Sequence, residues 1–501
     1  MIYSDFTLTS PLSELEDGAA PLLTLTIVWH PDRARIGEQF VGGAGGDVVE
    51  LNRFLPLFMH PGCEGLPLGH GGISRQPLRL VRDAHDGVAM SLPASPMAVE
   101  VNGRIAKDTI HFTAAQIAQG QILTLGRAVV LCLHWMHRLP VPNAVPGFIG
   151  VGSASITVRE QIHMVARTSM PVLLVGETGT GKEIAARAIH ALSGRGEAPL
   201  VAVNMAALGE STAAGELFGA APGAHPGAPA AREGLFAQAD GGTLFLDEIG
   251  NAPAAVQPML LRAIEGGGYR PIGAAADRRS SARLIAASDQ DLDAAAFNPA
   301  LLHRLQGFVI RMPLLRERRE DVGVLVVDLL RRQGIEADLP AALVAELAAW
   351  EWPGNVRELS HVLQRAALML GEGAVPTLAQ LVQATRPRVE EAPAPAIDAA
   401  SRGEAAASRR RPSALSDSDV LDAMAGNDWN IQAAAQALGI SRPSLYKLLE
   451  DHPDIRRPEA IPEDDIARAM LASAGDIERC AALLKTPAEA LRRRWRILRP
   501  N

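Results

Sequence analysis

The chain has 501 residues, of which 48% are hydrophobic and 21% charged, and its formal net charge at pH 7 is −8. This balance is typical of a globular protein with buried cores. It excludes a protein that is basic all over, as a nucleic-acid coat would be, but leaves room for a local basic patch. The three cysteines lie far apart, and no apolar stretch reaches the about 18 residues that a membrane span needs. We therefore expect a multidomain cytoplasmic protein with no membrane partner.

Residues 1–140 consist of short apolar or alternating runs that are separated by Gly, Pro and Asp turns. The runs are LLTLTIVW, DVVELNRF, LRLV, MAVEV, TIHF, ILTL and AVVLCLHW. Strands and turns at this spacing are typical of two packed sheets. The sequence therefore predicts an N-terminal all-β sandwich over residues 1–140.

Four polar residues of this region carry a resemblance to a known binding site: Arg53 in ELNRF, Ser74 and Arg75 in GGISRQPLRL, and Asn102 in VEVNGR. Through them, residues 21–136 resemble a forkhead-associated (FHA) domain, a β-sandwich that binds phosphothreonine. The resemblance implies a phosphothreonine protein as partner, with an arginine and a serine on the phosphate and the asparagine on the ligand backbone. Arginine suits this role because its planar fork matches phosphate oxygens.

Two positions depart from the FHA pattern. Pro77 stands where the family usually has a structural histidine, and Asn52 replaces the glycine before the arginine. A sandwich that keeps the fold without binding a phosphopeptide is therefore the alternative.

Pro140, Pro142 and Pro146 mark a linker, and the sequence pattern changes after it. From Ile156 onward, helical stretches alternate with the buried strands PVLLVG, TLFLDEIG and ARLIAAS, and helices continue to about residue 386. This alternation is typical of a parallel α/β sheet. We expect an α/β core over residues 148–315 and a helical lid over residues 316–386.

The segment GETGTGKE lies between the strand PVLLV and the helical stretch EIAARAIHAL, which is the setting of a P-loop. Its glycines free the backbone N–H groups to wrap phosphate, and the next helix adds partial positive charge. Lys182 would reach the β- and γ-phosphates of ATP. The predicted ATP-binding residues of the loop are Gly176, Glu177, Thr178, Gly179, Thr180, Gly181, Lys182 and Glu183.

A pair of carboxylates, Asp247 and Glu248, ends the hydrophobic strand in GGTLFLDEIG. With a P-loop upstream, we expect Asp247 to hold Mg²⁺ through water and Glu248 to polarise the attacking water. The alternative is a solvated carboxylate pair that simply follows a core strand.

Residues 148–386 resemble the AAA+ domain of bacterial enhancer-binding proteins, the activators of sigma-54 RNA polymerase. The resemblance is carried by the Lys–Glu end of the P-loop and by GELFG, GGTLFLDEIG, PLLRERREDV and WPGNVREL. It implies a homo-oligomer, usually a hexamer, that hydrolyses ATP between subunits. It also implies that Asn204 is a switch residue for Glu248, that Arg357 is a lid arginine on nucleotide phosphate, and that Arg304 acts on a neighbouring subunit.

Three positions depart from that family. The loop that contacts sigma-54 reads Gly-Ala-Phe-Thr-Gly-Ala in the family and GAHPGA here, and the proline removes a backbone donor and fixes φ. Asn298 replaces the first of two trans-acting arginines, and Ser288 and Asp289 replace the Thr-Asn of the first sensor. The sigma-contact residues are Gly223, Ala224, His225, Pro226, Gly227 and Ala228.

The C-terminal part begins with a low-complexity tether over residues 387–412, rich in Ala, Pro and Arg. NIQAAAQALGISRPSLYKLLE, within residues 413–450, resembles the Fis-type helix-turn-helix. The resemblance implies DNA as partner, with Arg442, Ser444 and Lys447 facing the major groove or phosphates. The alternative is a three-helix module without DNA contact.

Residues 460–498 form a second helical cluster that aligns with the first at a constant offset of 46 residues, which predicts an all-α duplication. Its last helix is rich in arginine. That helix is compatible with a second DNA-reading head, a phosphate clamp or a surface for dimer packing.

Three functions remain compatible with the sequence. The leading hypothesis is an ATP-dependent regulator of transcription that resembles sigma-54 activators. The second is a DNA-binding regulator that uses ATP for assembly and never contacts sigma-54, which GAHPGA and Asn298 favour. The third is a phospho-dependent adaptor protein.

Overall fold

The computed structural model describes residues 21–42, 48–224, 231–292, 297–336, 338–383, 416–427, 429, 431–438, 445, 448–449, 455, 461–473, 477–487, 491 and 494–495. The chain divides into two compact units, residues 1–389 and 390–501, and each is described by itself. Among the helices of these described residues, none has the length and apolar character to cross a membrane.

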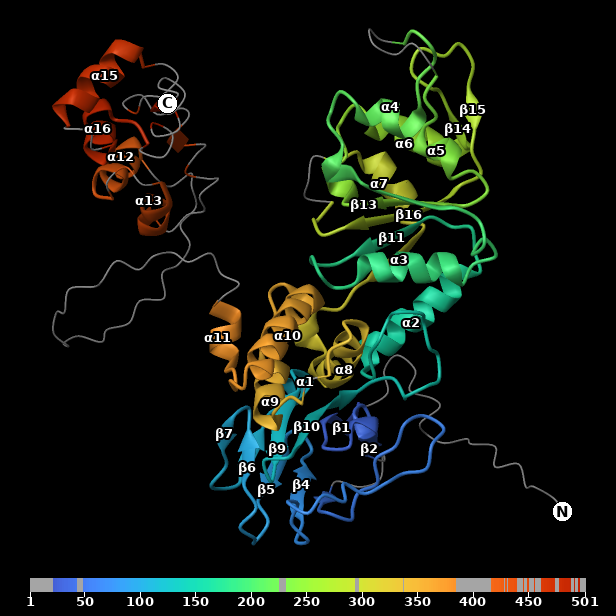
Figure 1. The fold of residues 1–501 in the computed structure, drawn as a ribbon, viewed down its shortest axis with the longest axis vertical. Helices are drawn as coiled ribbons and strands as arrows, with labels where there is room; N and C mark the ends of the chain where they lie inside the picture. Colours follow the sequence, from blue (N-terminus) through green and yellow to red (C-terminus); the bar gives the residue numbers. More distant parts are fainter. Residues whose placement is uncertain are drawn as a thin grey trace. The chain divides into compact units, whose positions relative to one another are not determined.

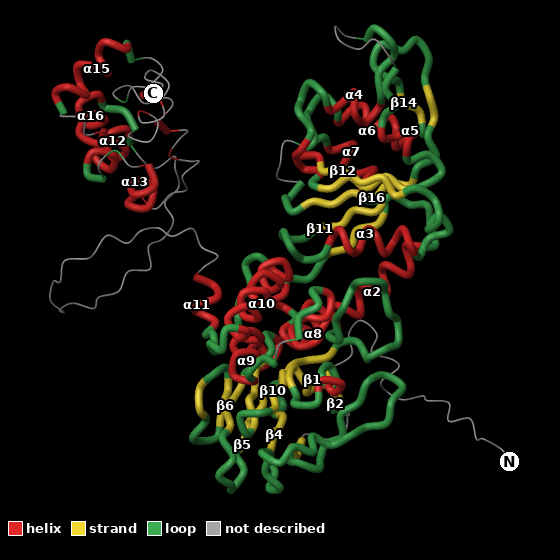
Figure 2. The backbone as a smooth tube through the Cα atoms, viewed as in Figure 1, coloured by secondary structure: helices red, strands yellow, loops and turns green. Residues whose placement is uncertain are grey.

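The N-terminal region is β-rich, as the alternating runs predicted, and it forms two antiparallel sheets (Figures 1 and 2). The larger sheet has the order β2-β1-β10-β9-β6-β7, and the smaller has the order β3-β4-β5-β8. The strands of the larger sheet are β1 (Leu22–Trp29), β2 (Gln39–Val41), β6 (Val99–Val101), β7 (Arg104–Ile105), β9 (Gln121–Leu125) and β10 (Val129–Met136). Those of the smaller sheet are β3 (Val48–Leu51), β4 (Leu78–Arg82), β5 (Val88–Ser91) and β8 (Ile110–Phe112).

The two central strands of the larger sheet, β1 and β10, are buried along their whole length. Because successive side chains of a strand point to opposite faces, two different neighbours must cover them. Leu25, Ile27 and Leu131 belong to the core between the two sheets. Val28 and Val130, on the other face, belong to a core that they share with helices of the lid.

The lid consists of α8 (Val322–Arg332), α9 (Ala341–Ala349), α10 (Asn355–Gly371) and α11 (Leu378–Gln383). Helices α8 and α9 contact β1, and α9 also contacts β9 and β10, so these helices cover the outer face of the larger sheet (Figure 1). Gly323 permits this approach, because a Cβ at that position would clash with the carbonyl oxygen of Val28. The sandwich and the lid are therefore joined by direct packing.

The central α/β region holds a five-stranded parallel sheet of order β12-β13-β16-β11-β17. Its strands are β11 (Val172–Val175), β12 (Leu200–Asn204), β13 (Thr243–Asp247), β16 (Arg283–Ser288) and β17 (Phe308–Arg311). Helices α2 (Ser153–Ala166) and α3 (Lys182–Ala191) contact this sheet. Since the strands are parallel, their carboxyl ends share one edge, where the P-loop and the Asp247 carboxylate meet.

The second unit is all-helical, with α12 (Asp417–Ala425), α13 (Ile431–Leu438), α15 (Glu463–Ala472) and α16 (Ile477–Leu484) around one apolar core. Trp429, Leu438 and Leu445 are buried in that core. Glu463 follows Asp417 by 46 residues, and Ile477 follows Ile431 by 46. The two helix pairs thus begin at the same offset of 46 residues as the sequence alignment, and the duplication stays a prediction.

Candidate nucleotide-binding site

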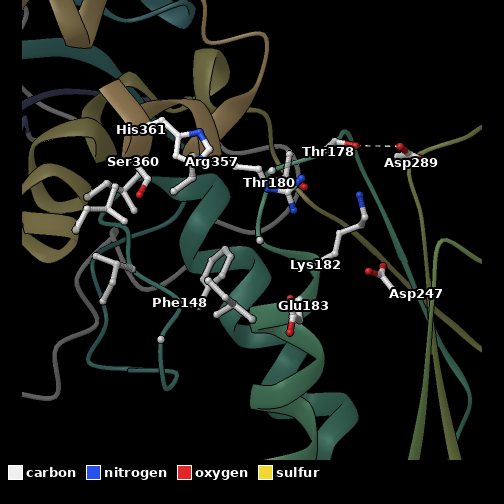
Figure 3. A pocket seen from close by; sticks show the side chains of 18 of the residues that line it. Phe148, Thr178, Thr180, Lys182, Glu183, Asp247, Asp289, Arg357, Ser360 and His361 are labelled. Carbon is white, nitrogen blue, oxygen red and sulfur yellow. Dashed lines mark hydrogen bonds between the residues drawn. The ribbon is translucent and has the colours of Figure 1, made fainter. Parts of the chain in front are cut away.

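The P-loop runs from the end of β11 to the start of α3 and lines a cavity of about 310 Å³ (Figure 3). Gly179 and Gly181 have φ values of 81° and 104°, a region that strongly favours glycine. Gly179 also lies against the lid, where a Cβ would clash with the carbonyl oxygen of Gly354. The glycines are therefore required both by backbone conformation and by the close approach of the lid.

Lys182 is the first residue of α3, and only 9% of its surface is exposed. Its Nζ donates to the carbonyl oxygens of Gly176 at 2.6 Å and Glu177 at 3.1 Å. Burial lowers the pKa of Lys182, and the charges of Asp289 and Asp247 partly oppose that shift. The ammonium group thus lies in a partly desolvated pocket that contains acidic side chains.

Asp247 and Glu248 line the same cavity as Lys182, at the end of β13. The Asp247 carboxylate is partly buried, and this burial raises its pKa. Its Oδ1 accepts the backbone N–H of Glu248 at 3.1 Å. Glu248 has a φ of 52°, a strained value for a side chain with a Cβ, and such strain is common at functional sites.

The lid is hydrogen-bonded to the P-loop through the side chain of Glu177. Arg316 donates to the Glu177 carboxylate at 2.9 Å, and Asn355 donates to the same carboxylate at 3.1 Å. These hydrogen bonds lower the pKa of Glu177. The backbone N–H of Val356 donates to the carbonyl of Gly179 at 3.0 Å. Glu177, which we expected to bind nucleotide, therefore has its side chain turned toward the lid.

Arg357 lies on the lid side of the cavity, near Thr180 (Figure 3). A second arginine, Arg318, lines the cavity from the interior and was not singled out from the sequence, although it stands in PLLRERREDV. Arg318 is 1% exposed, donates to the Ser155 hydroxyl at 3.1 Å, and lies 5.6 Å from the Phe148 ring centroid. Only the fold reveals that this motif reaches the pocket.

Asn204 ends β12, and its position in the sheet is directly beside Asp247. Its side-chain oxygen accepts the backbone N–H of Ala206 at 2.8 Å, which caps a short 3-10 turn. The Glu248 carboxylate instead accepts from Asn251 at 3.4 Å. Asn204, the expected switch residue, thus lies beside Asp247 at the carboxyl ends of the strands, and its side chain bonds to the following turn rather than to Glu248.

The two positions of the expected trans-acting arginines differ in their roles. Arg304 is 60% exposed on α7 (Pro299–Leu305), where its Nε donates to Glu265 at 3.0 Å. Asn298 is the N-cap of α7, since its side-chain oxygen accepts the N–H groups of Ala300 and Leu301. An asparagine before a proline at the helix start is a recognisable cap signal, so Asn298 has a structural role here.

At the sensor position, the two substituted residues point in different directions. Ser288 is 1% exposed, and its hydroxyl donates to the carbonyl of Gln290 at 3.0 Å. Asp289 lines the cavity, and its Oδ2 accepts the Thr178 hydroxyl at 2.9 Å (Figure 3). Of the two residues, Asp289 rather than Ser288 therefore faces the pocket.

Parts of the other predicted sites lie outside the described residues. In the sigma-contact loop, Gly223 and Ala224 are described, whereas residues 225–228 are not. Arg442, Ser444 and Lys447 of the predicted DNA-reading helix also lie outside the described residues.

In the front sandwich, the structure brings Arg53 and Ser74 together, since the Arg53 N–H donates to the Ser74 carbonyl at 2.9 Å. The Arg53 guanidinium also donates to the carbonyls of Gly71 and Ile73. Asn102 is tied to β9, because its side chain accepts the N–H of Ile122 at 2.9 Å and donates to Gln121 at 2.9 Å. Two of the four predicted phosphopeptide residues, Arg53 and Asn102, thus have side chains that are hydrogen-bonded within the sandwich.

A parallel sheet with a P-loop, two strand-end carboxylates and a helical lid defines a P-loop module of the AAA+ class. Residues 148–311 match the family described as Sigma-54 interaction domain, and residues 316–397 match the AAA+ ATPase lid domain. Residues 420–451 match the bacterial regulatory protein, Fis family. The chain therefore carries the AAA+ domain, the lid and the Fis-type helix-turn-helix that are found in sigma-54-dependent regulators, as its motifs predicted.

Individual relatives support this assignment. The anaerobic nitric oxide reductase transcription regulator NorR of Vibrio vulnificus strain YJ016 is 45% identical over 230 residues, which are 44% of this chain and 45% of that protein. The regulatory protein LuxO of Vibrio cholerae is 38% identical over 325 residues, or 62% and 59% of the two chains. The chain thus spans about half the length of the curated relatives it matches.

Among solved structures, NtrX from Brucella abortus in complex with ATP matches at 26% identity. The match covers 62% of this chain and 70% of that chain, with a TM-score of 0.43.

Proposed function

We propose that this chain is a transcription regulator that binds DNA and uses ATP to act on sigma-54 RNA polymerase. The observation that carries the proposal is the meeting of Lys182, Asp247 and Glu248 on one cavity beside the lid residue Arg357. The match of residues 420–451 to the Fis family supports DNA as a partner.

The side chains of the cavity fit a magnesium–nucleotide complex. The glycine-rich loop and the N-terminus of α3 offer backbone N–H groups and partial positive charge to phosphate. Lys182 would exchange its two carbonyl partners for phosphate oxygens, and Asp247 would hold Mg²⁺ through water. Magnesium supplies positive charge that neutralises the phosphates during transfer. Glu248 would orient and deprotonate the attacking water.

We propose that hydrolysis takes place between subunits of a homo-oligomer, a hexamer by family resemblance. Arg304 supports this, because its exposed guanidinium has a surface partner, Glu265, that a neighbouring subunit's nucleotide could replace. An arginine supplied in this way contributes about 10³ to 10⁵ to the rate of phosphoryl transfer in related reactions.

A second candidate function is a DNA-binding regulator that uses ATP for assembly and does not engage sigma-54. The observation that favours it is Asn298, whose side chain caps α7 and offers no cation to a neighbouring active site. The proline in GAHPGA favours it as well. Promoter opening by sigma-54 polymerase, with and without ATP, separates the two: the first function requires ATP-dependent opening.

We also propose that the front sandwich is FHA-like and receives a phosphothreonine protein. Its contact with the lid offers a physical route to the ATP site. Arg319 of the lid donates to the carbonyl of Gly120 in the sandwich at 3.4 Å, and the preceding residue, Arg318, lines the cavity. A ligand that shifts the sandwich would thereby shift a side chain of the nucleotide pocket.

The nucleotide site is tested by replacing its lysine. Lys182→Ala should weaken ATP binding by at least about 100-fold, because the ammonium group and its phosphate hydrogen bonds are lost. Lys107→Ala, at an exposed position of the sandwich, is the matched control and should leave ATP affinity unchanged. Equal affinity of Lys182→Ala and the unaltered chain in an equilibrium titration contradicts the proposed site.

A further inference from the structure

Asp289 and Thr178 form a direct link across the mouth of the nucleotide cavity. Thr178 belongs to the P-loop and Asp289 follows the end of β16, and the Thr178 hydroxyl donates to Asp289 Oδ2 at 2.9 Å (Figure 3). Both side chains are exposed, and both line the cavity. The link thus joins the loop that would wrap phosphate to the neighbouring strand end.

The carboxylate of Asp289 adds to an acidic wall that already contains Asp247 and Glu248. Burial lowers the pKa of Lys182 and the charges of Asp289 and Asp247 oppose that shift, and both carboxylates line the same cavity as the ammonium group. The P-loop lysine is the group that meets the terminal phosphates of a bound triphosphate. A negative charge near that lysine is therefore also near the site of the terminal phosphate.

We propose that Asp289 is a residue that sets nucleotide specificity, lowering the affinity of the pocket for ATP relative to ADP. The inference rests on the proposed function of the cavity as an ATP site. The affinity for ATP is lowered because the formal charge of the Asp289 carboxylate repels the additional charge of the third phosphate. The Thr178 hydroxyl donates to that carboxylate at 2.9 Å, but the proposed effect depends on the charge of Asp289 and not on this hydrogen bond.

The size of the effect follows from like-charge repulsion at a cavity mouth where Asp289 is exposed, so solvent screens part of it. A neighbouring like charge under these conditions changes a charge-dependent equilibrium by up to about tenfold. ADP lacks the phosphate that would lie closest to Lys182 and Asp289. The repulsion should therefore act mainly on ATP, and salt should weaken it.

Two variants of the full-length chain separate the charge from the hydrogen bond. Asp289→Asn keeps an oxygen that accepts the Thr178 hydroxyl and removes only the charge. Thr178→Val keeps the charge and removes the hydroxyl. Affinities for a hydrolysis-resistant ATP analogue and for ADP are measured by equilibrium titration with Mg²⁺, at low and high salt.

We expect Asp289→Asn to bind the ATP analogue about tenfold more tightly and ADP less than about threefold more tightly, with a smaller difference at high salt. Thr178→Val should keep the ratio of the two affinities within about twofold of the unaltered chain. An unchanged ratio in Asp289→Asn, or the same gain in Thr178→Val, overturns the inference. Failure of the unaltered chain to bind either nucleotide would instead overturn the proposed function.

Discussion

The two large sheets of the first unit use their surroundings in opposite ways. The parallel sheet of the α/β region has an apolar core on each face, and Asp247 and the P-loop line a cavity at the carboxyl ends of its strands. The larger sheet of the sandwich is buried on both faces at β1 and β10, once by its own partner sheet and once by the lid. The first sheet builds a site from local motifs, whereas the second builds an interface from residues with no motif.

The contrast shows that the front sandwich packs directly on the lid of the AAA+ module. Val28 and Val130 pack in the same core as Leu325 and Val344 of the lid. A lid that moves against the nucleotide would have to carry the sandwich with it. Variants that separate the two regions therefore test whether the sandwich–lid interface matters for the pocket.

The largest expected effect comes from Gly323→Val, which puts a branched side chain against the backbone of β1. Overpacking of this kind typically destabilises by about 1–3 kcal/mol, and here backbone cannot give way easily. We expect a lower free energy of unfolding and faster protease cleavage between sandwich and lid. Chemical denaturation and limited proteolysis measure both.

Gly371→Ala is the matched control for Gly323→Val. It alters a glycine of the same lid, at the end of α10, around which a Cβ would meet nothing within 4 Å. Stability should stay within about 0.5 kcal/mol of the unaltered chain. If both variants behave alike, the sandwich does not depend on close packing against α8.

A pH-dependent effect of similar size is expected from His134, which is 3% exposed on β10. Its Nε2 accepts the Thr26 hydroxyl at 2.8 Å, and its Nδ1 donates to the Trp135 carbonyl at 3.1 Å. Burial lowers the pKa of His134 from 6.5 to about 4. The folded state thus holds this ring neutral where the unfolded state already binds a proton.

The free energy of unfolding should therefore fall as pH drops from about 6.5 to 4, and His134 should account for up to about 3 kcal/mol of that loss. Above about pH 6.5 the neutral ring should contribute its full stabilisation. His134→Gln removes the titration, so the difference in unfolding free energy between the variant and the unaltered chain should change over that window. Glu320 nearby has its pKa raised to about 8, and the comparison cancels its contribution. A constant difference from pH 7 to pH 4 contradicts a neutral buried His134.

The smallest effect on stability is expected in the predicted phosphopeptide site, where Arg53 and Arg75 differ. Arg53 donates to the Ile73 carbonyl at 3.1 Å, so Arg53→Ala should lower stability by about 1 kcal/mol. Arg75 is exposed, and Arg75→Ala should leave stability unchanged while weakening binding of a phosphothreonine peptide. Undiminished peptide binding by both variants, or no binding by the unaltered sandwich, contradicts the FHA-like function.

Much of the nucleotide site was predictable because its signals are local. A strand, a glycine-rich turn and a helix stand in consecutive order around Lys182, and Asp247 ends a strand of uninterrupted apolar residues. That the side chains of Glu177 and Ser288 point away from the pocket was not predictable. Their side chains are directed by Arg316 of the lid and by the local turn at Gln290, and neither partner is encoded in the motif itself.

The sequence by itself determined the strand-rich front, the P-loop with its carboxylates and the helical tail, because hydrophobic period, glycine placement and capping act over a few residues. Only the tertiary structure decided that the outer face of β1 and β10 packs on the lid, that Arg318 reaches the pocket, and that Asp289 bonds to Thr178. These contacts join segments more than 100 residues apart. A buried face indicates in the sequence that it must be covered, but not which segment covers it.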